Sequence, residues 1–72
     1  MPRYHFDLVD SQIVADEGGA EMPDEAAATV AADLLAKRLI QERPELRNRG
    51  FAILVTDEDG EQVGRFPLDV IH

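Results

Sequence analysis

The sequence from residue 24 to residue 43 reads DEAAATVAADLLAKRLIQER, and its apolar residues recur at the spacing of an α-helix. Asp24 is a good N-cap residue, Glu25 suits the positive end of the helix dipole, and Pro44 helps to end the helix. We expect one broad apolar face to pack on the core, formed by Ala27, Ala28, Val30, Ala31, Leu34, Leu35 and Leu39.

Two strands are predicted before this helix. Residues 3–9 alternate between apolar and polar side chains, as in a strand with one buried face. The expected inward side chains are Tyr4, Phe6 and Leu8. Residues 13–15 are short and rich in β-branched side chains, so they form a hairpin with the first strand through a turn at residues 10–12. Residues 16–23 contain two glycines and a proline, which predicts a loop.

Two more strands are predicted after the helix. Residues 51–56 are the most continuously apolar run, which indicates a central strand, and residues 57–60 form a tight turn that ends in glycine. Residues 61–68 return as the last strand. Gly64 and Pro67 interrupt it, and both residues are expected at a sheet edge or a bulge.

The predicted fold class is therefore α+β, with a ββαββ order of elements in one domain over residues 1–72. The most apolar strands take the centre, so we expect a four-stranded antiparallel sheet of order 2-1-3-4 with one helix packed on one face. In this topology the acidic segments 16–21 and 57–61 lie together at the amino-terminal end of the helix. The opposite end carries the cations Lys37, Arg38, Arg43, Arg47 and Arg49.

Charge and composition exclude several classes of partner. Fifteen acidic residues against seven basic ones give a net charge of -8, which disfavours nucleic acid and anionic membrane surfaces. No cysteine is present, so we expect neither disulfides nor thiolate metal sites, and a reducing cytoplasm fits best. The longest apolar run, residues 51–55, is far too short to span a bilayer, and the first residues lack the apolar region of an export signal.

Few residues suggest a catalytic or metal-binding site. His5 and Asp7 project from the same face of the first strand, as a proton-transfer pair or half of a metal site would. The other imidazole is His72, and zinc prefers three or four protein ligands, so we interpret the pair as ordinary surface residues. Ser11 is the only serine and lies in a predicted turn.

The acidic segments resemble calcium loops only incompletely. Asp57, Asp59 and Gly60 lack the second interval of an EF-hand loop, and the segment 16–19 is a weaker match, so we interpret the first as a turn. Loose binding of a divalent ion by the two acidic loops stays open. We predict no catalytic residue, no cofactor-binding residue and no dedicated metal ligand.

Three stretches of the sequence stand out together: the opening MPRYHF at residues 1–6, the step EMPD at residues 21–24 into an alanine-rich helix, and the turn VTDEDG at residues 55–60. They resemble a family of short bacterial proteins of unknown function, a domain group common in alphaproteobacteria. The resemblance spans nearly the whole chain. Its motifs are a strand, a helix cap and a turn, so it implies the fold and supplies no site residue, cofactor or substrate.

The function that we expect is a non-catalytic protein-interaction module that associates with itself or with a protein partner through a sheet edge or its charged ends. Ile40 and Leu46 have no obvious place of burial in a monomer and are candidates for such a surface. The alternative is a regulatory or antitoxin-like acidic protein that binds a basic partner. An enzyme ranks third, because so short a chain has little room for a pocket.

Overall fold

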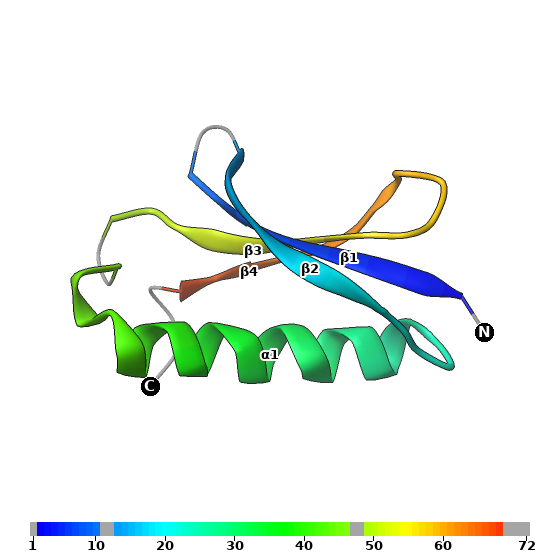
Figure 1. Cartoon of the computed structure of the whole chain (residues 1–72), viewed down its shortest axis with the longest axis horizontal. Coiled ribbons are helices and arrows are strands. Elements are labelled where there is room, and N and C mark those ends of the chain that lie inside the picture. The colour runs from blue at the N-terminus through cyan, green and yellow to red at the C-terminus, as the bar shows by residue number, and fades with distance from the viewer. Residues whose placement is uncertain (1, 11–12, 47–48, 69–72) are drawn as a thin grey trace.

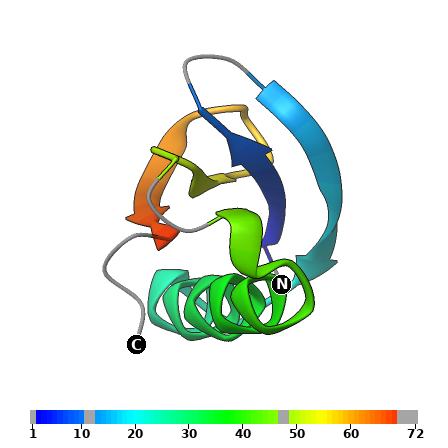
Figure 2. The same cartoon turned by 90° about the vertical axis from the view of Figure 1, so that its left-hand side faces the viewer.

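The computed structural model describes residues 2–10, 13–46 and 49–68. Its elements follow in the order β1 (Arg3–Val9), β2 (Ile13–Glu21), α1 (Glu25–Glu42), the 3-10 helix η1 (Pro44–Leu46), β3 (Ala52–Thr56) and β4 (Gln62–Pro67). The strands form one antiparallel sheet in the order β2-β1-β3-β4, which confirms the predicted fold (Figure 1). Seen from one end, the sheet curves over one side of α1 (Figure 2). None of the helices among the described residues combines the length and the apolar character needed to cross a membrane.

Local side-chain chemistry sets both ends of α1. The Asp24 carboxylate accepts a hydrogen bond from the backbone N–H of Ala27 at 2.9 Å, so the predicted N-cap is confirmed. At the other end, the backbone N–H of Arg43 donates to the carbonyl of Leu39 at 2.7 Å. Pro44 has no N–H to continue this ladder, and the chain turns there into η1.

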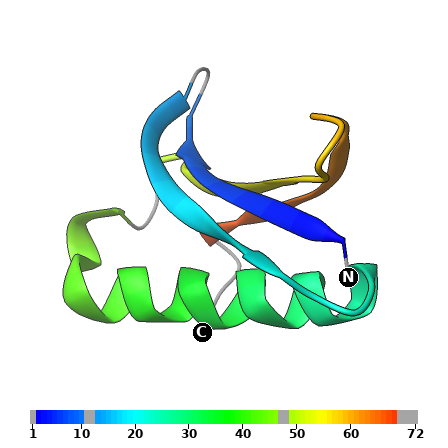
Figure 3. The ribbon, with the colours of Figure 1, turned by 45° about the vertical axis from the view of Figure 1, so that its right-hand side comes forward.

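Strand β2 is longer than predicted, and the expected loop at residues 16–23 is wrong. The strand continues to Glu21 and runs beside β1 toward the start of α1 (Figure 3). Gly18 has a φ of 91°, and a Cβ on Gly19 would lie 2.8 Å from the carbonyl oxygen of Tyr4. The glycines therefore allow a bulged strand to approach its neighbour closely, where the sequence pattern suggested a flexible segment.

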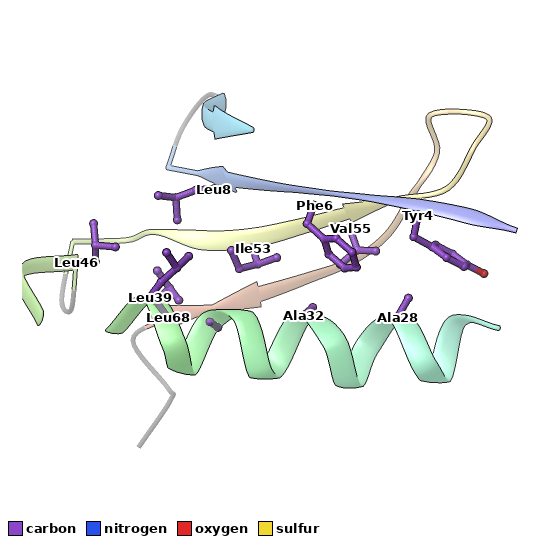
Figure 4. Packing of buried hydrophobic residues seen from close by; sticks show 11 residues of the cluster. Tyr4, Phe6, Leu8, Ala28, Ala32, Leu39, Leu46, Ile53, Val55 and Leu68 are labelled. Atoms are coloured by element: carbon purple, nitrogen blue, oxygen red, sulfur yellow. The ribbon is translucent and has the colours of Figure 1, made fainter. Parts of the chain in front are cut away.

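The core lies between the sheet and α1, and the two layers contribute side chains of different size (Figure 4). The sheet supplies the large residues Tyr4, Phe6, Leu8, Ile53 and Val55. The helix supplies mainly Ala28, Ala32 and Ala36, each of which is fully buried. Because an alanine side chain ends at Cβ, this stripe lets the helix backbone lie close to the bulky sheet residues.

The helix is rotated relative to the expected orientation. Val30 and Leu34 were predicted to face the core, and this prediction is wrong, since they are 60% and 61% exposed. Leu39 is buried as expected. Apolar residues occupy nearly every side of α1, so their periodicity does not define a single face. The bulk of the sheet side chains selects the alanine stripe instead.

Leu46 and Ile40 also differ from expectation, because both contribute to the core. Leu46 is only 8% exposed, and Ile40 is half-buried and packs against the same cluster. The short helix η1 turns the chain back over the end of the sheet and thereby brings Leu46 onto it. Neither residue therefore belongs to a free apolar surface.

Candidate functional site

A cluster of one imidazole and two carboxylates lies on the outer face of the sheet, the face turned away from α1. His5 and Asp7 share this face because their neighbours Tyr4 and Phe6 point into the core. His5 Nε2 lies 3.2 Å from Asp7 Oδ1 and 3.1 Å from Asp16 Oδ1. The three candidate ligand atoms all lie within 4.8 Å of one another.

A register shift between β1 and β2 brings Asp16 into this cluster. His5 pairs with Gly19, and a regular antiparallel ladder would then place Glu17 opposite Asp7. The bulge between His5 and Asp7 places Asp16 there instead. Asp16 is the residue that the sequence interpretation missed, because a residue assigned to a loop has no cross-strand neighbour.

The strand order explains why Asp7 is buried although it lies on the outer face. Asp7 belongs to a central strand and pairs with Asp16 on one side and with Leu54 on the other. These neighbours leave the Asp7 side chain 11% exposed, compared with 41% for His5 and 67% for Asp16. The cluster thus has a fixed carboxylate at its base and two more accessible side chains above it.

Glycines position the other two members of the cluster. The backbone N–H of Gly18 donates to Asp16 Oδ1 at 2.7 Å, which holds this carboxylate against the bulge. Gly19 lies beside the imidazole, where a Cβ would come within 3.3 Å of His5 Nδ1. Carboxylates directly opposite one another in a sheet repel, so a group between Asp7 and Asp16 stabilises the pair if it offsets their negative charge. A protonated imidazole or a metal cation can do so.

The amino-terminal end of α1 carries acidic groups around Tyr4. The Tyr4 ring is in the core, with its oxygen directed toward this end of the molecule (Figure 4). Burial raises the pKa of Tyr4 above its ordinary value of 10.0, and the nearby carboxylates raise it further. These carboxylates belong to Glu25, Asp24, Asp57 and Glu58. Tyr4 lies on the opposite face of β1 from His5 and so takes no part in the imidazole cluster.

The acidic turn between β3 and β4 is confirmed as a turn. Asp57 Oδ1 accepts hydrogen bonds from the backbone N–H groups of Asp59 and Glu61, both at 2.9 Å. Gly60 adopts a φ of 83°, as the tight turn requires. The Asp57 carboxylate therefore serves to shape the turn.

The structure describes four of the five cations predicted for the carboxyl-terminal end of the helix. Lys37 Nζ forms an ion pair with Asp33 Oδ2 at 2.9 Å, at the i,i+4 spacing. Arg38, Arg43 and Arg49 are exposed. Arg47, like Ser11 and His72, lies outside the described residues.

Comparison with known proteins gives a family and no individual relative. No curated protein and no solved structure matches the chain. The family model described as "Domain of unknown function (DUF6894)" matches residues 3–69, which is almost the full length. The chain therefore belongs to the DUF6894 family.

Proposed function

We propose that this protein is a non-catalytic interaction module that pairs with a second copy of itself through the outer side of α1. The observation that carries the proposal is the exposure of Val30 and Leu34 at 60% and 61%. They stand one helical turn apart, on the side of the helix about 180° from the buried alanine stripe. Among the described side chains, they are the large apolar residues left exposed.

The charge along the helix favours an antiparallel second copy as the occupant. Asp24 and Glu25 lie at the amino-terminal end of α1, whereas Arg38 and Arg43 lie near its carboxyl end, and all four are exposed. Antiparallel pairing centred between Val30 and Leu34 brings Asp24 and Glu25 of each copy toward Arg38 and Arg43 of the other. Parallel pairing would bring like charges together.

The sheet edges are poorer surfaces for association. The edge strand β2 contains the bulge and exposes Asp16 and Glu21, and the edge strand β4 contains Gly64 and Pro67. Bulges, charges and proline are the features that keep an edge from pairing with another strand. The helix face has no bulge and no proline, and antiparallel pairing brings its charged residues toward opposite charges, so it is the better supported interface. A chain of this length also buries a small core, and pairing adds to its stability.

The proposal includes a bacterial cytoplasmic setting. The absence of cysteine supports the cytoplasmic setting. The bacterial origin rests on the resemblance carried by residues 1–6, 21–24 and 55–60. The second candidate function is that of a regulatory or antitoxin-like acidic protein that binds a basic partner. The carboxylates gathered around Tyr4 at one end of the molecule favour this candidate as the alternative.

Sedimentation equilibrium from micromolar to millimolar concentration tests the self-association. We expect a monomer–dimer equilibrium, and we expect Leu34→Gln to lower the association constant by at least about tenfold, because burial of a leucine is worth about 1.5 kcal/mol or more. A protein that stays monomeric throughout would overturn the proposal. So would an association constant that Leu34→Gln leaves unchanged.

A matched pair of charge reversals tests the antiparallel arrangement. Arg38→Glu and Arg65→Glu change the net charge equally, but Arg38 lies on α1 and Arg65 lies on the edge strand β4. We expect Arg38→Glu to weaken the dimer and Arg65→Glu to leave it intact. Equal effects would contradict the proposed interface. If the protein purified from its native cells is a monomer bound one-to-one to a basic protein, the alternative function is favoured.

A further inference from the structure

The cluster on the outer face of the sheet has the composition of a metal site. We infer that His5, Asp7 and Asp16 bind a divalent transition-metal ion, with Zn²⁺ as the ion best suited to them. The inference is independent of the proposed dimer, because these residues lie on the sheet face turned away from α1. On its own, the His5–Asp7 pair provides two ligands, and the bulge supplies Asp16 as the third.

The two distances from His5 Nε2 to the carboxylates fit a single ion, and the two carboxylate oxygens lie within 4.8 Å of each other. Ligand atoms about 2.0–2.2 Å from zinc, at tetrahedral or octahedral angles, lie about 3–3.5 Å from each other. His5 Nε2 is 3.2 Å from Asp7 Oδ1 and 3.1 Å from Asp16 Oδ1. The imidazole nitrogen therefore already lies at the distance from each carboxylate oxygen that two ligands of one zinc ion would have. The Asp16 side chain is 67% exposed, so it has room to adjust its oxygen to the ion.

The chemistry of the ligands selects the class of metal. Imidazole nitrogen favours zinc, nickel, copper and iron, whereas magnesium and calcium prefer sets made only of oxygen ligands. Three protein ligands leave coordination positions for water or for a group from another molecule. The 41% exposure of His5 gives solvent access to such a position.

The fold holds part of this site in place before any ion arrives. Asp7 is fixed on a central strand between two neighbours, and Asp16 Oδ1 receives the N–H of Gly18. The same fold sets two carboxylates opposite each other, a pairing that disfavours the sheet unless a positive charge lies between them. A divalent ion at this position would offset the charge of both carboxylates and would be coordinated by His5 Nε2.

Isothermal titration of the chelator-treated full chain with Zn²⁺, followed in parallel by amide NMR shifts, tests the inference. We expect saturable binding of one ion per chain, with the largest shifts at residues 5, 7 and 16, and a rise in the melting temperature. Mg²⁺ at the same concentration is expected to leave these amides unmoved. Failure of Zn²⁺ to saturate, or equal shifts with Mg²⁺, would overturn the assignment.

Two pairs of variants separate this site from general attraction of cations to an acidic protein. Asp16→Asn and Glu17→Gln remove the same charge from adjacent positions of β2. We expect only Asp16→Asn to weaken Zn²⁺ binding, by at least about tenfold, since even residues that merely orient ligands are worth about 10- to 100-fold. His5→Gln should do the same, and His72→Gln should not.

Circular dichroism of each variant shows whether it is folded. Asp16 and His5 are exposed enough for their variants to fold, which keeps the comparison valid. Equal loss of affinity in Asp16→Asn and Glu17→Gln would contradict the site. Loss of binding in His72→Gln alone would place the ion elsewhere and overturn the inference. If Zn²⁺ binds as expected while the protein stays monomeric, the metal site stands and the proposed dimer falls.

Discussion

The two faces of the sheet are stabilised in different ways, although successive side chains of the same strands point alternately to one face and to the other. On the inner face, side chains from the sheet and from α1 fit together by volume, with large residues opposite alanines. On the outer face, His5 and Asp7 depend on charge and on the register of the neighbouring strand. The inner face therefore tolerates changes of charge and size poorly, whereas the outer face is sensitive to which residue stands opposite.

The largest difference is expected between the adjacent residues Ile53 and Leu54 of β3. Ile53 is fully buried on the inner face, and Leu54 is half-buried on the outer face. Ile53→Ala should lower the free energy of unfolding by about 2–5 kcal/mol, because the helix cannot collapse fully into the space. Leu54→Ala should cost about 1 kcal/mol. Urea denaturation followed by circular dichroism measures both, and equal losses would contradict the division into two faces.

The two sides of α1 give the next largest effect. Ala32→Leu places a bulky side chain where none is accommodated and should cost about 1–3 kcal/mol of unfolding free energy. At a protein concentration low enough to keep the chain monomeric, Leu34→Ala, on the exposed side, should change stability by less than about 0.5 kcal/mol. The same denaturation experiment checks this pair. A stabilising Ala32→Leu would mean that the helix lies farther from the sheet than the alanine stripe implies.

A smaller effect is expected at Gly19. This residue lies beside the backbone of Tyr4, whose side chain is on the inner face, and beside the His5 side chain on the outer face. Gly19→Ala brings a methyl group to 2.8 Å from the Tyr4 carbonyl oxygen and 3.3 Å from His5 Nδ1. The strand must shift, so we expect a loss of about 1–2 kcal/mol together with a changed His5 imidazole signal in NMR spectra. An unchanged imidazole signal would show that the strand does not hold His5 in its position.

The smallest effect concerns alkaline pH. The raised pKa of Tyr4 means that the folded protein keeps the phenolic proton at a pH where the unfolded chain loses it. The stability from this group is thus fully present below pH 10.0 and declines as the pH rises toward the raised value. Tyr4→Phe should remove this decline. Denaturation at a series of pH values between neutral and alkaline compares the two proteins, and parallel curves would contradict the prediction.

Much of the fold could be predicted because its strongest patterns are local. The alternation of residues 3–9 identifies β1, Asp24 identifies the start of α1, and the interruptions at Gly64 and Pro67 place β4 at an edge. Each of these signals acts within a few residues of chain. They were enough to obtain the strand order.

The remaining features depend on contacts between distant segments. The glycines of β2 look like a loop until β1 is present to pair with them, and so Asp16 was not placed beside His5. The rotation of α1 is likewise decided by the bulk of the sheet side chains and not by the helix alone. Leu46 is buried because η1 turns the chain back, which its local sequence does not specify.

The position of Tyr4 has a practical consequence for spectroscopy. The chain has one tyrosine and no tryptophan, so its ultraviolet emission comes essentially from this single ring. The ring is packed in the core, while its hydroxyl group lies near carboxylates at the start of α1. One natural fluorophore, without any attached dye, will therefore report both the loss of the core and the arrival of a ligand at that end.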